Sequence, residues 1–170
     1  MMGWADARNS EAGVTLVELM TVVAIIAIVS AMAIPNFKAW IARSQLKEAI
    51  LELHSNLNLA RMAAMNRNTT ITATVFVSGG RVNATFTDPS NTSANCLADR
   101  SSCVLPTQVM PGQVNQVGGT TTFQFNSLGL RVGGGTANQS IQLTNTSGMT
   151  FEIQVTPAGR ARWCASSPCP

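Results

Sequence analysis

The sequence predicts an α+β fold in which one long amino-terminal helix packs on a head built from an antiparallel β-sheet. Three segments carry this prediction: an apolar run over residues 14–35, an amphipathic helical pattern over residues 36–68, and a Thr-, Val-, Gly-, Ser- and Asn-rich segment over residues 69–170. Of the 170 residues, 45% are hydrophobic and 11% are charged, with a net charge of +3. So little charge argues against a disordered chain and against a surface that coats nucleic acid over its whole area.

The apolar run is long enough to cross a membrane. Residues 14–35 carry one charge, that of Glu18. As a helix, this run would measure about 33 Å, against a bilayer hydrocarbon core of about 30 Å. A buried core helix is the alternative, but such helices seldom run this far without a polar face. We therefore expect a transmembrane helix over residues 14–35.

The helical pattern continues past Pro35 into an amphipathic segment. Apolar residues recur there at spacings of three and four, which places them in one stripe on the helix. The stripe consists of Leu46, Ile50, Leu53, Leu57, Ala60 and Ala64. A polar cluster at residues 66–68 marks the expected end of the helix. We expect this second half to pack on the head.

Strand patterns follow in the head. Residues 70–77 and 81–87 are β-branched runs joined by Ser78-Gly79-Gly80, which is a hairpin signal. Further strands are expected at residues 121–126, 140–144, 150–156 and 160–164, and a loop is expected over residues 88–105. The prediction is one antiparallel sheet of about six strands.

The four cysteines lie in the head and allow three pairings. We favour Cys96–Cys103 and Cys164–Cys169, because short separations are easily closed. Neither spacing is that of a Cys-x-x-Cys zinc site, so we expect no metal. We find no phosphate-binding glycine loop and no catalytic triad around the single histidine. The sequence therefore predicts a protein that is not an enzyme and needs no cofactor.

The junction before the apolar run carries a recognisable motif. Residues 1–13 lack the basic excess of an ordinary secretory signal. Gly13, Val14 and Glu18 ahead of an uninterrupted apolar helix resemble the type IV prepilin signature. The resemblance implies that a prepilin peptidase removes the leader 1–13 by cutting after Gly13 and that the new amine of Val14 is methylated.

The resemblance also gives Glu18 a role in assembly. A carboxylate in hydrocarbon costs several kcal/mol unless it is paired. The resemblance implies that Glu18 of one subunit neutralises the amino terminus of its neighbour in a filament. The alternative is a lone glutamate that reaches the water at the membrane surface.

Three segments of the head resemble the GspH/FimT family of minor pilins and pseudopilins: residues 59–68, 123–129 and 159–162. This resemblance implies a minor pilin of a type IV pilus, placed in the pilus or its tip complex. An H-type pseudopilin of a type II secretion system is the alternative. The implied partners are other major and minor pilins or pseudopilins, and inner-membrane lipid before assembly. The head would lie in the periplasm, where disulfides persist, and afterwards in the pilus or a periplasmic pseudopilus.

Two arginines form the remaining pattern. Arg160 and Arg162 are two positions apart, so on a strand both point to the same face and can clamp successive phosphates. In the FimT-like minor pilins that this motif resembles, Gly-Arg-x-Arg is implicated in DNA capture. That implies non-sequence-specific binding of double-stranded DNA by Arg160 and Arg162, with Arg131 as a helper. The alternative is a charged edge strand that discourages aggregation.

Overall fold

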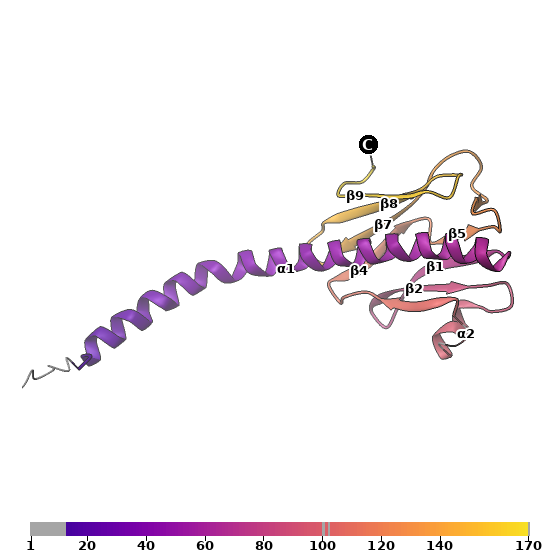
Figure 1. The fold of residues 1–170 in the computed structure, drawn as a ribbon. Helices are drawn as coiled ribbons and strands as arrows, with labels where there is room; N and C mark the ends of the chain where they lie inside the picture. The colour runs from indigo at the N-terminus through magenta and orange to yellow at the C-terminus, as the bar shows by residue number, and fades with distance from the viewer. Residues whose placement is uncertain (1–12, 100, 102, 170) are drawn as a thin grey trace, which may run out of the picture. The chain divides into compact units, whose positions relative to one another are not determined.

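The computed structural model describes residues 13–99, 101 and 103–169, and within them it leaves out the side chains of residues 32–36, 93 and 116. The predicted leader, residues 1–13, lies outside this part apart from Gly13. The chain divides into two compact units, Met1–Lys38 and Ala39–Pro170. One helix, α1 (Leu16–Arg67), belongs to both (Figure 1).

The part of α1 in the second unit forms the expected apolar stripe. All six predicted stripe residues, from Leu46 to Ala64, have an exposed fraction of 0%. The helix ends where the polar cluster predicted, because Asn68 adopts a left-handed backbone with φ of 50°. The Asn68 amide then donates to the Met65 carbonyl at 3.3 Å, and the Thr69 amide donates to the Ala64 carbonyl at 3.2 Å. This Schellman-type ending satisfies carbonyls that the helix leaves without partners.

The head contains two antiparallel sheets. The first has the order β3-β2-β1-β5-β6 and the second has the order β4-β7-β8-β9. The bounds are β1 Ile71–Ser78, β2 Arg81–Thr87, β3 Leu105–Val109, β4 Val114–Gly119, β5 Thr122–Phe125, β6 Arg131–Val132, β7 Gln139–Asn145, β8 Thr150–Val155 and β9 Ala161–Cys164. A short helix, α2 (Ser93–Ala98), follows β2.

The prediction of one sheet with about six strands was wrong, because the described residues form two sheets with five and four strands. It missed β3, β4 and β6, and it placed α2 and the start of β3 in a loop. Strand β3 contains Pro106, which is compatible with a strand only at an edge, and β3 is an edge strand of its sheet. Helix α2 forms because the Thr92 side chain caps it by accepting from the Asn95 amide at 3.2 Å.

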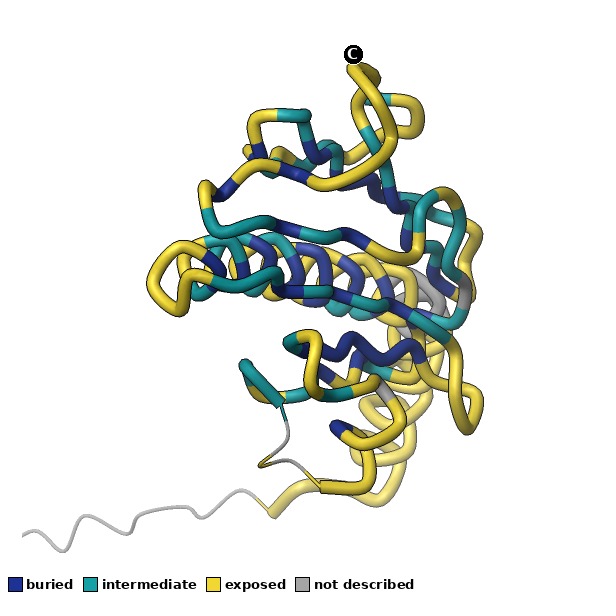
Figure 2. Tube along the Cα trace, turned by 90° about the vertical axis from the view of Figure 1, so that its right-hand side faces the viewer, coloured by how far each residue is buried: buried dark blue, intermediate teal, exposed yellow. Residues whose placement is uncertain are grey.

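One hydrophobic core joins α1 to both sheets. Its largest fully buried side chains include Phe86 of β2, Phe123 of β5, Ile141 of β7 and Leu53 of α1. Figure 2 shows buried residues on the turns of α1 that lie among the strands, whereas exposed residues dominate the loops. Two buried side chains also fix the helix: Asn145 Nδ2 donates to the Ala42 carbonyl at 3.2 Å, and Gln108 Nε2 donates to the Ala49 carbonyl at 3.1 Å.

Candidate functional site

The amino-terminal junction lies at the start of α1. Thr15 caps the helix: its Oγ1 accepts from the Glu18 amide at 3.2 Å, and its carbonyl accepts from the Leu19 amide at 3.1 Å. Val14 is 72% exposed, and Glu18 is exposed as well. Thr15 and Glu18 have the spacing of a capping box, a signal that the prediction overlooked. The Gly13–Val14 bond and the Glu18 carboxyl are therefore both accessible.

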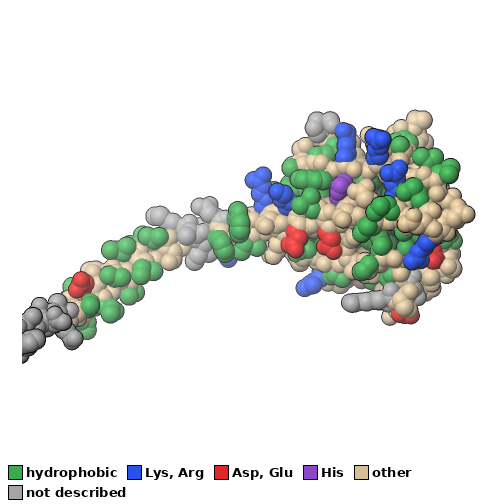
Figure 3. Space-filling model, viewed as in Figure 1, with side chains coloured by type: hydrophobic (Ala, Val, Ile, Leu, Met, Phe, Trp, Pro, Cys, Tyr) green, Lys and Arg blue, Asp and Glu red, His purple; other side chains and the backbone are tan. Residues whose placement is uncertain are grey.

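The first part of α1 has an exposed apolar surface. Every large apolar side chain from Val14 to Val29 is at least half exposed, as the green side chains along this part of the helix show in Figure 3. They are Val14, Leu16, Val17, Leu19, Met20, Val22, Val23, Ile25, Ile26, Ile28 and Val29. A surface of this kind marks a site of contact with protein or membrane. Among the residues whose structure is described, no helix meets the length and apolarity required of a membrane span.

The predicted arginine pair lies at the start of β9, with Arg162 in the strand and Arg160 directly before it. Arg160 and Arg162 are exposed, while Ala161 and Trp163 between and beside them pack against the core. Arg162 donates from Nε and Nη2 to Gln154 Oε1 at 3.1 and 2.7 Å. Both arginines are thus exposed to solvent, Arg162 from within β9 and Arg160 from the turn before it.

A tight turn before the pair brings in a third arginine. Gly159 has φ of +74°, and a Cβ at this position would overlap the Gly129 carbonyl oxygen of the neighbouring turn. The same oxygen accepts a hydrogen bond from Arg61 Nε of α1 at 2.8 Å. Arg61 Nε also lies 3.0 Å from where the Gly159 Cβ would stand. Arg61 is thus adjacent to the turn that leads into Arg160, and we call Arg61, Arg160 and Arg162 the arginine corner.

Arg131, the predicted helper, does not join this corner. Its exposed fraction is 7%. Its guanidinium donates to three backbone carbonyls of the following loop, those of Gly133, Gly135 and Ala137. Arg131 therefore organises its own loop rather than facing a ligand. The arginine that lies beside the Gly159 turn is Arg61, which is far away in the sequence and which no local motif indicated.

A buried carboxylate is linked through Gln154 to Arg162 of the arginine corner. Glu152 is 2% exposed. Its carboxylate accepts from Ser167 Oγ at 2.8 Å, from Gln154 Nε2 at 3.2 Å and from Gln142 Nε2 at 3.4 Å. Burial raises the pKa of Glu152, but the hydrogen bonds from Ser167, Gln154 and Gln142 outweigh it, so the pKa lies below its usual value. Gln154 thus bridges this negative charge and Arg162.

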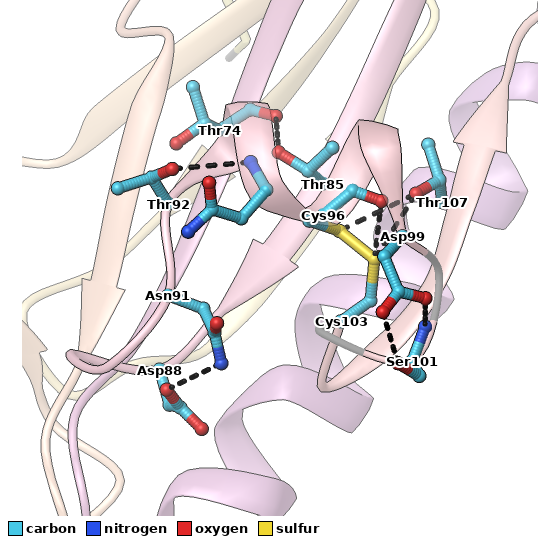
Figure 4. The surroundings of a disulfide bond; sticks show 11 residues. Thr74, Thr85, Asp88, Asn91, Thr92, Cys96, Asp99, Ser101, Cys103 and Thr107 are labelled. Atoms are coloured by element: carbon cyan, nitrogen blue, oxygen red, sulfur yellow. Dashed lines mark hydrogen bonds between the residues drawn. A yellow bond between two sulfur atoms is a disulfide. The ribbon is translucent and has the colours of Figure 1, made fainter.

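Two disulfides close short loops of the head. Cys96 of α2 pairs with Cys103 at a Cα separation of 4.9 Å, and Cys164 of β9 pairs with Cys169 at 5.7 Å. This is the pairing that the separations favoured. Figure 4 shows the first disulfide beside Thr107 of β3 and the Asp99–Ser101 hydrogen bonds. In the described part of the chain, His, Cys, Asp and Glu residues form no group that could hold a metal ion.

Comparisons with known proteins match both the amino-terminal segment and the head. The family model "Type II transport protein GspH" matches residues 49–159, and the model "Prokaryotic N-terminal methylation motif" matches residues 8–34. The chain therefore belongs to the GspH family and carries a prepilin-type amino terminus. It is a pilin-like or pseudopilin-like minor pilin. Proteins of this family and fold are structural pilins rather than enzymes.

The curated relatives align over short segments only. A fimbrial protein of Moraxella nonliquefaciens is 51% identical over 41 residues, which is 24% of this chain and 27% of the relative. The type IV major fimbrial protein FimA of Dichelobacter nodosus is 49% identical over 45 residues, 26% of this chain and 29% of the relative. The aligned part of this chain thus spans less than a third of the length of these two proteins.

The fold has a counterpart among solved structures. The type IV minor pilin FimU of Pseudomonas aeruginosa superimposes with a TM-score of 0.52 at 16% identity, over 74% of this chain and 97% of that chain. At this identity the likeness concerns the fold. The predicted architecture, a long helix followed by antiparallel strands, is confirmed as the type IV pilin fold.

Proposed function

We propose that this chain is a minor pilin of a type IV pilus. The exposed apolar surface from Val14 to Val29 carries the proposal, because it is joined to a head that already has its own complete core. Such a surface can be buried in lipid before assembly and against other subunits afterwards. The helix then supplies the polymerisation surface, and the head supplies the specificity.

Processing at the amino terminus precedes assembly. A prepilin peptidase cuts after Gly13 and methylates the amine of Val14. Support comes from the methylation motif over residues 8–34 and from the exposure of Val14 ahead of the first helical turn. The helix anchors the protein in the inner membrane, and the head lies in the periplasm, an oxidising compartment in which both disulfides persist.

Glu18 directs the order of assembly. Its carboxylate lies among exposed apolar side chains, where an unpaired charge costs several kcal/mol once it is buried. The amine of Val14 in a neighbouring subunit carries the opposite charge and also lies in an apolar environment. Pairing the two favours insertion of a subunit at one axial position and disfavours others.

A type II secretion pseudopilus is the second candidate function. It is favoured by the family model of the head, whose description names type II transport. The pilus assignment is favoured by the fimbrial relatives, which match the amino-terminal segment. Deletion of the gene separates the two: loss of surface pili with intact protein export supports the pilus, and loss of export with intact pili supports the pseudopilus.

The arginine corner gives the pilin a second proposed activity, binding of double-stranded DNA without sequence preference. Arg160 and Arg162 are exposed at the start of β9, and Arg61 lies beside the turn that precedes them. Two or three guanidinium groups neutralise two or three phosphates, so the affinity should fall with salt with a logarithmic slope of about −2 to −3. The pilus would then hold DNA for uptake during natural transformation.

A gel-shift assay tests this activity. The processed chain in mild detergent should shift plasmid DNA at low salt and release it near physiological salt. Arg160→Gln with Arg162→Gln should abolish the shift, and Arg61→Gln alone should lower the salt slope by about one. The control pair is Arg67→Gln with Arg81→Gln, which removes two exposed arginines elsewhere. If the control pair weakens binding as much as the corner pair does, DNA binding is not a property of the corner.

A further inference from the structure

A groove on the outer face of α1 joins an aromatic side chain to two cations. Trp40, Arg43, Ser44 and Lys47 line a surface cavity of about 240 Å³. Their spacing of three, four and seven residues places all four on one face of the helix. Trp40 is 64% exposed, and the other three side chains are exposed too. The groove thus offers two positive charges, a hydroxyl and a flat aromatic wall to solvent.

The opposite face of the same helical turns is fixed to the head. Ala42 and Leu46 are 4% and 0% exposed, and the Ala42 carbonyl accepts the hydrogen bond from Asn145 Nδ2. Neither Arg43 nor Lys47 has an ion pair or side-chain hydrogen bond with another described residue. The helix backbone beneath the groove is therefore fixed to the head. Arg43 and Lys47 have no counterion among the described residues.

We propose that this groove binds the phosphate of an anionic phospholipid while the chain is held in the membrane. The proposal rests on the membrane-anchored stage of the proposed function. Trp40 follows Pro35, the end of the apolar run, by five residues, or about 7.5 Å of helix. The headgroup region beyond the hydrocarbon core is about that deep. Tryptophan prefers this level, and lysine or arginine beside it attracts anionic lipid.

An acidic side chain of a neighbouring pilin is the competing occupant. It would satisfy Arg43 and Lys47, but it would make no use of an exposed indole beside them. A phospholipid uses all parts of the groove, because its phosphate meets the cations and its glycerol backbone lies along the indole. The observations therefore favour lipid, and the contact would set the depth of the helix until the subunit leaves the membrane for the filament.

Tryptophan quenching by brominated lipid tests the proposal. The processed chain is reconstituted in phosphatidylcholine vesicles that contain a small fraction of brominated phosphatidylglycerol or, in parallel, brominated phosphatidylcholine. The processed chain retains Trp40 and Trp163, so Trp40→Phe supplies the background of Trp163. Each cation near an anionic lipid contributes about fivefold, so the preference for phosphatidylglycerol should be about 25-fold at low salt.

Matched variants assign the preference to the groove. Arg43→Gln with Lys47→Gln should reduce the preference to about one, whereas Arg67→Gln with Arg81→Gln should leave it unchanged. Equal quenching by the two brominated lipids in the wild-type chain would overturn the proposal. Removal of the preference by inorganic phosphate, but not by chloride of equal ionic strength, would support recognition of the phosphate group itself.

Two further outcomes separate the proposal from its rivals. If Arg43→Gln with Lys47→Gln keeps the lipid preference but lowers recovery of the chain in sheared fibres, the groove binds a neighbouring pilin and the lipid assignment is wrong. A chain that does not float with vesicles at all would overturn the membrane-anchored stage itself. Flotation without any lipid preference overturns only the groove.

Discussion

The contact between the turns at Gly129 and Gly159 should be the most sensitive point of the arginine corner. Replacing Gly159 with Ala has two costs. A non-glycine residue in the left-handed region costs about 1–2 kcal/mol. The new Cβ would also overlap the Gly129 carbonyl oxygen, so the turn must move and its hydrogen bond from Arg61 is lost. A hydrogen bond to a charged group contributes about 1.5–3 kcal/mol.

Gly80→Ala is the matched control. Gly80 has a similar φ of +72°, but a Cβ at Gly80 has no atom within 4 Å. It therefore carries the backbone cost alone, about 1–2 kcal/mol. We expect Gly159→Ala to lower the free energy of unfolding by about 2.5–5 kcal/mol in all, which is about 1.5–3 kcal/mol more than Gly80→Ala.

Urea unfolding of residues 39–170, the compact second unit, measures both values. The slope of the free energy against urea should stay constant, so that the midpoint shift reports stability. Equal losses in the two variants would show that the close approach of the two turns contributes nothing. The description of the arginine corner as one packed unit would then be wrong.

Three other predictions follow from the same structure. Because the pKa of Glu152 is lowered in the folded chain, the stability from its carboxylate is complete above the usual value of 4.5 and is lost as pH falls through the folded pKa; Glu152→Gln should flatten unfolding free energy against pH in that range. Replacing Cys164 and Cys169 by Ser removes a short loop closure and should lower the free energy of unfolding in urea by about 2 kcal/mol. An unchanged free energy of unfolding would show that the bond does not restrict the denatured chain. Glu18→Ala should leave processing intact but sharply lower recovery of the chain in sheared fibres, and wild-type recovery would remove the need for the pairing with Val14.

The elements with strong periodicity were predictable. The stripe from Leu46 to Ala64 predicted which face of α1 is buried, and Ser78-Gly79-Gly80 predicted the first hairpin. The weak points were edge strands, where packing on one side leaves a faint pattern. Strand β3 carries Pro106, and β6 has two residues, so neither gives a local signal.

The site residues also differ in whether the local sequence determines their position. The exposure of Arg162 could be predicted, because alternation along a strand depends on the local sequence alone, whereas Arg160 lies in the turn before the strand. The positions of Arg61 and Arg131 could not be predicted, since they depend on contacts between distant turns. The Gly129 carbonyl draws Arg61 toward the corner, and three loop carbonyls hold Arg131 away from solvent.

The mass of the amino-terminal peptide of the protein from its native membrane tests the central proposal most directly. We predict a chain that begins at Val14 with one added methyl group and is recovered both from the inner membrane and from sheared fibres. A chain that keeps residues 1–13 in every fraction and never occurs in fibres would contradict the account.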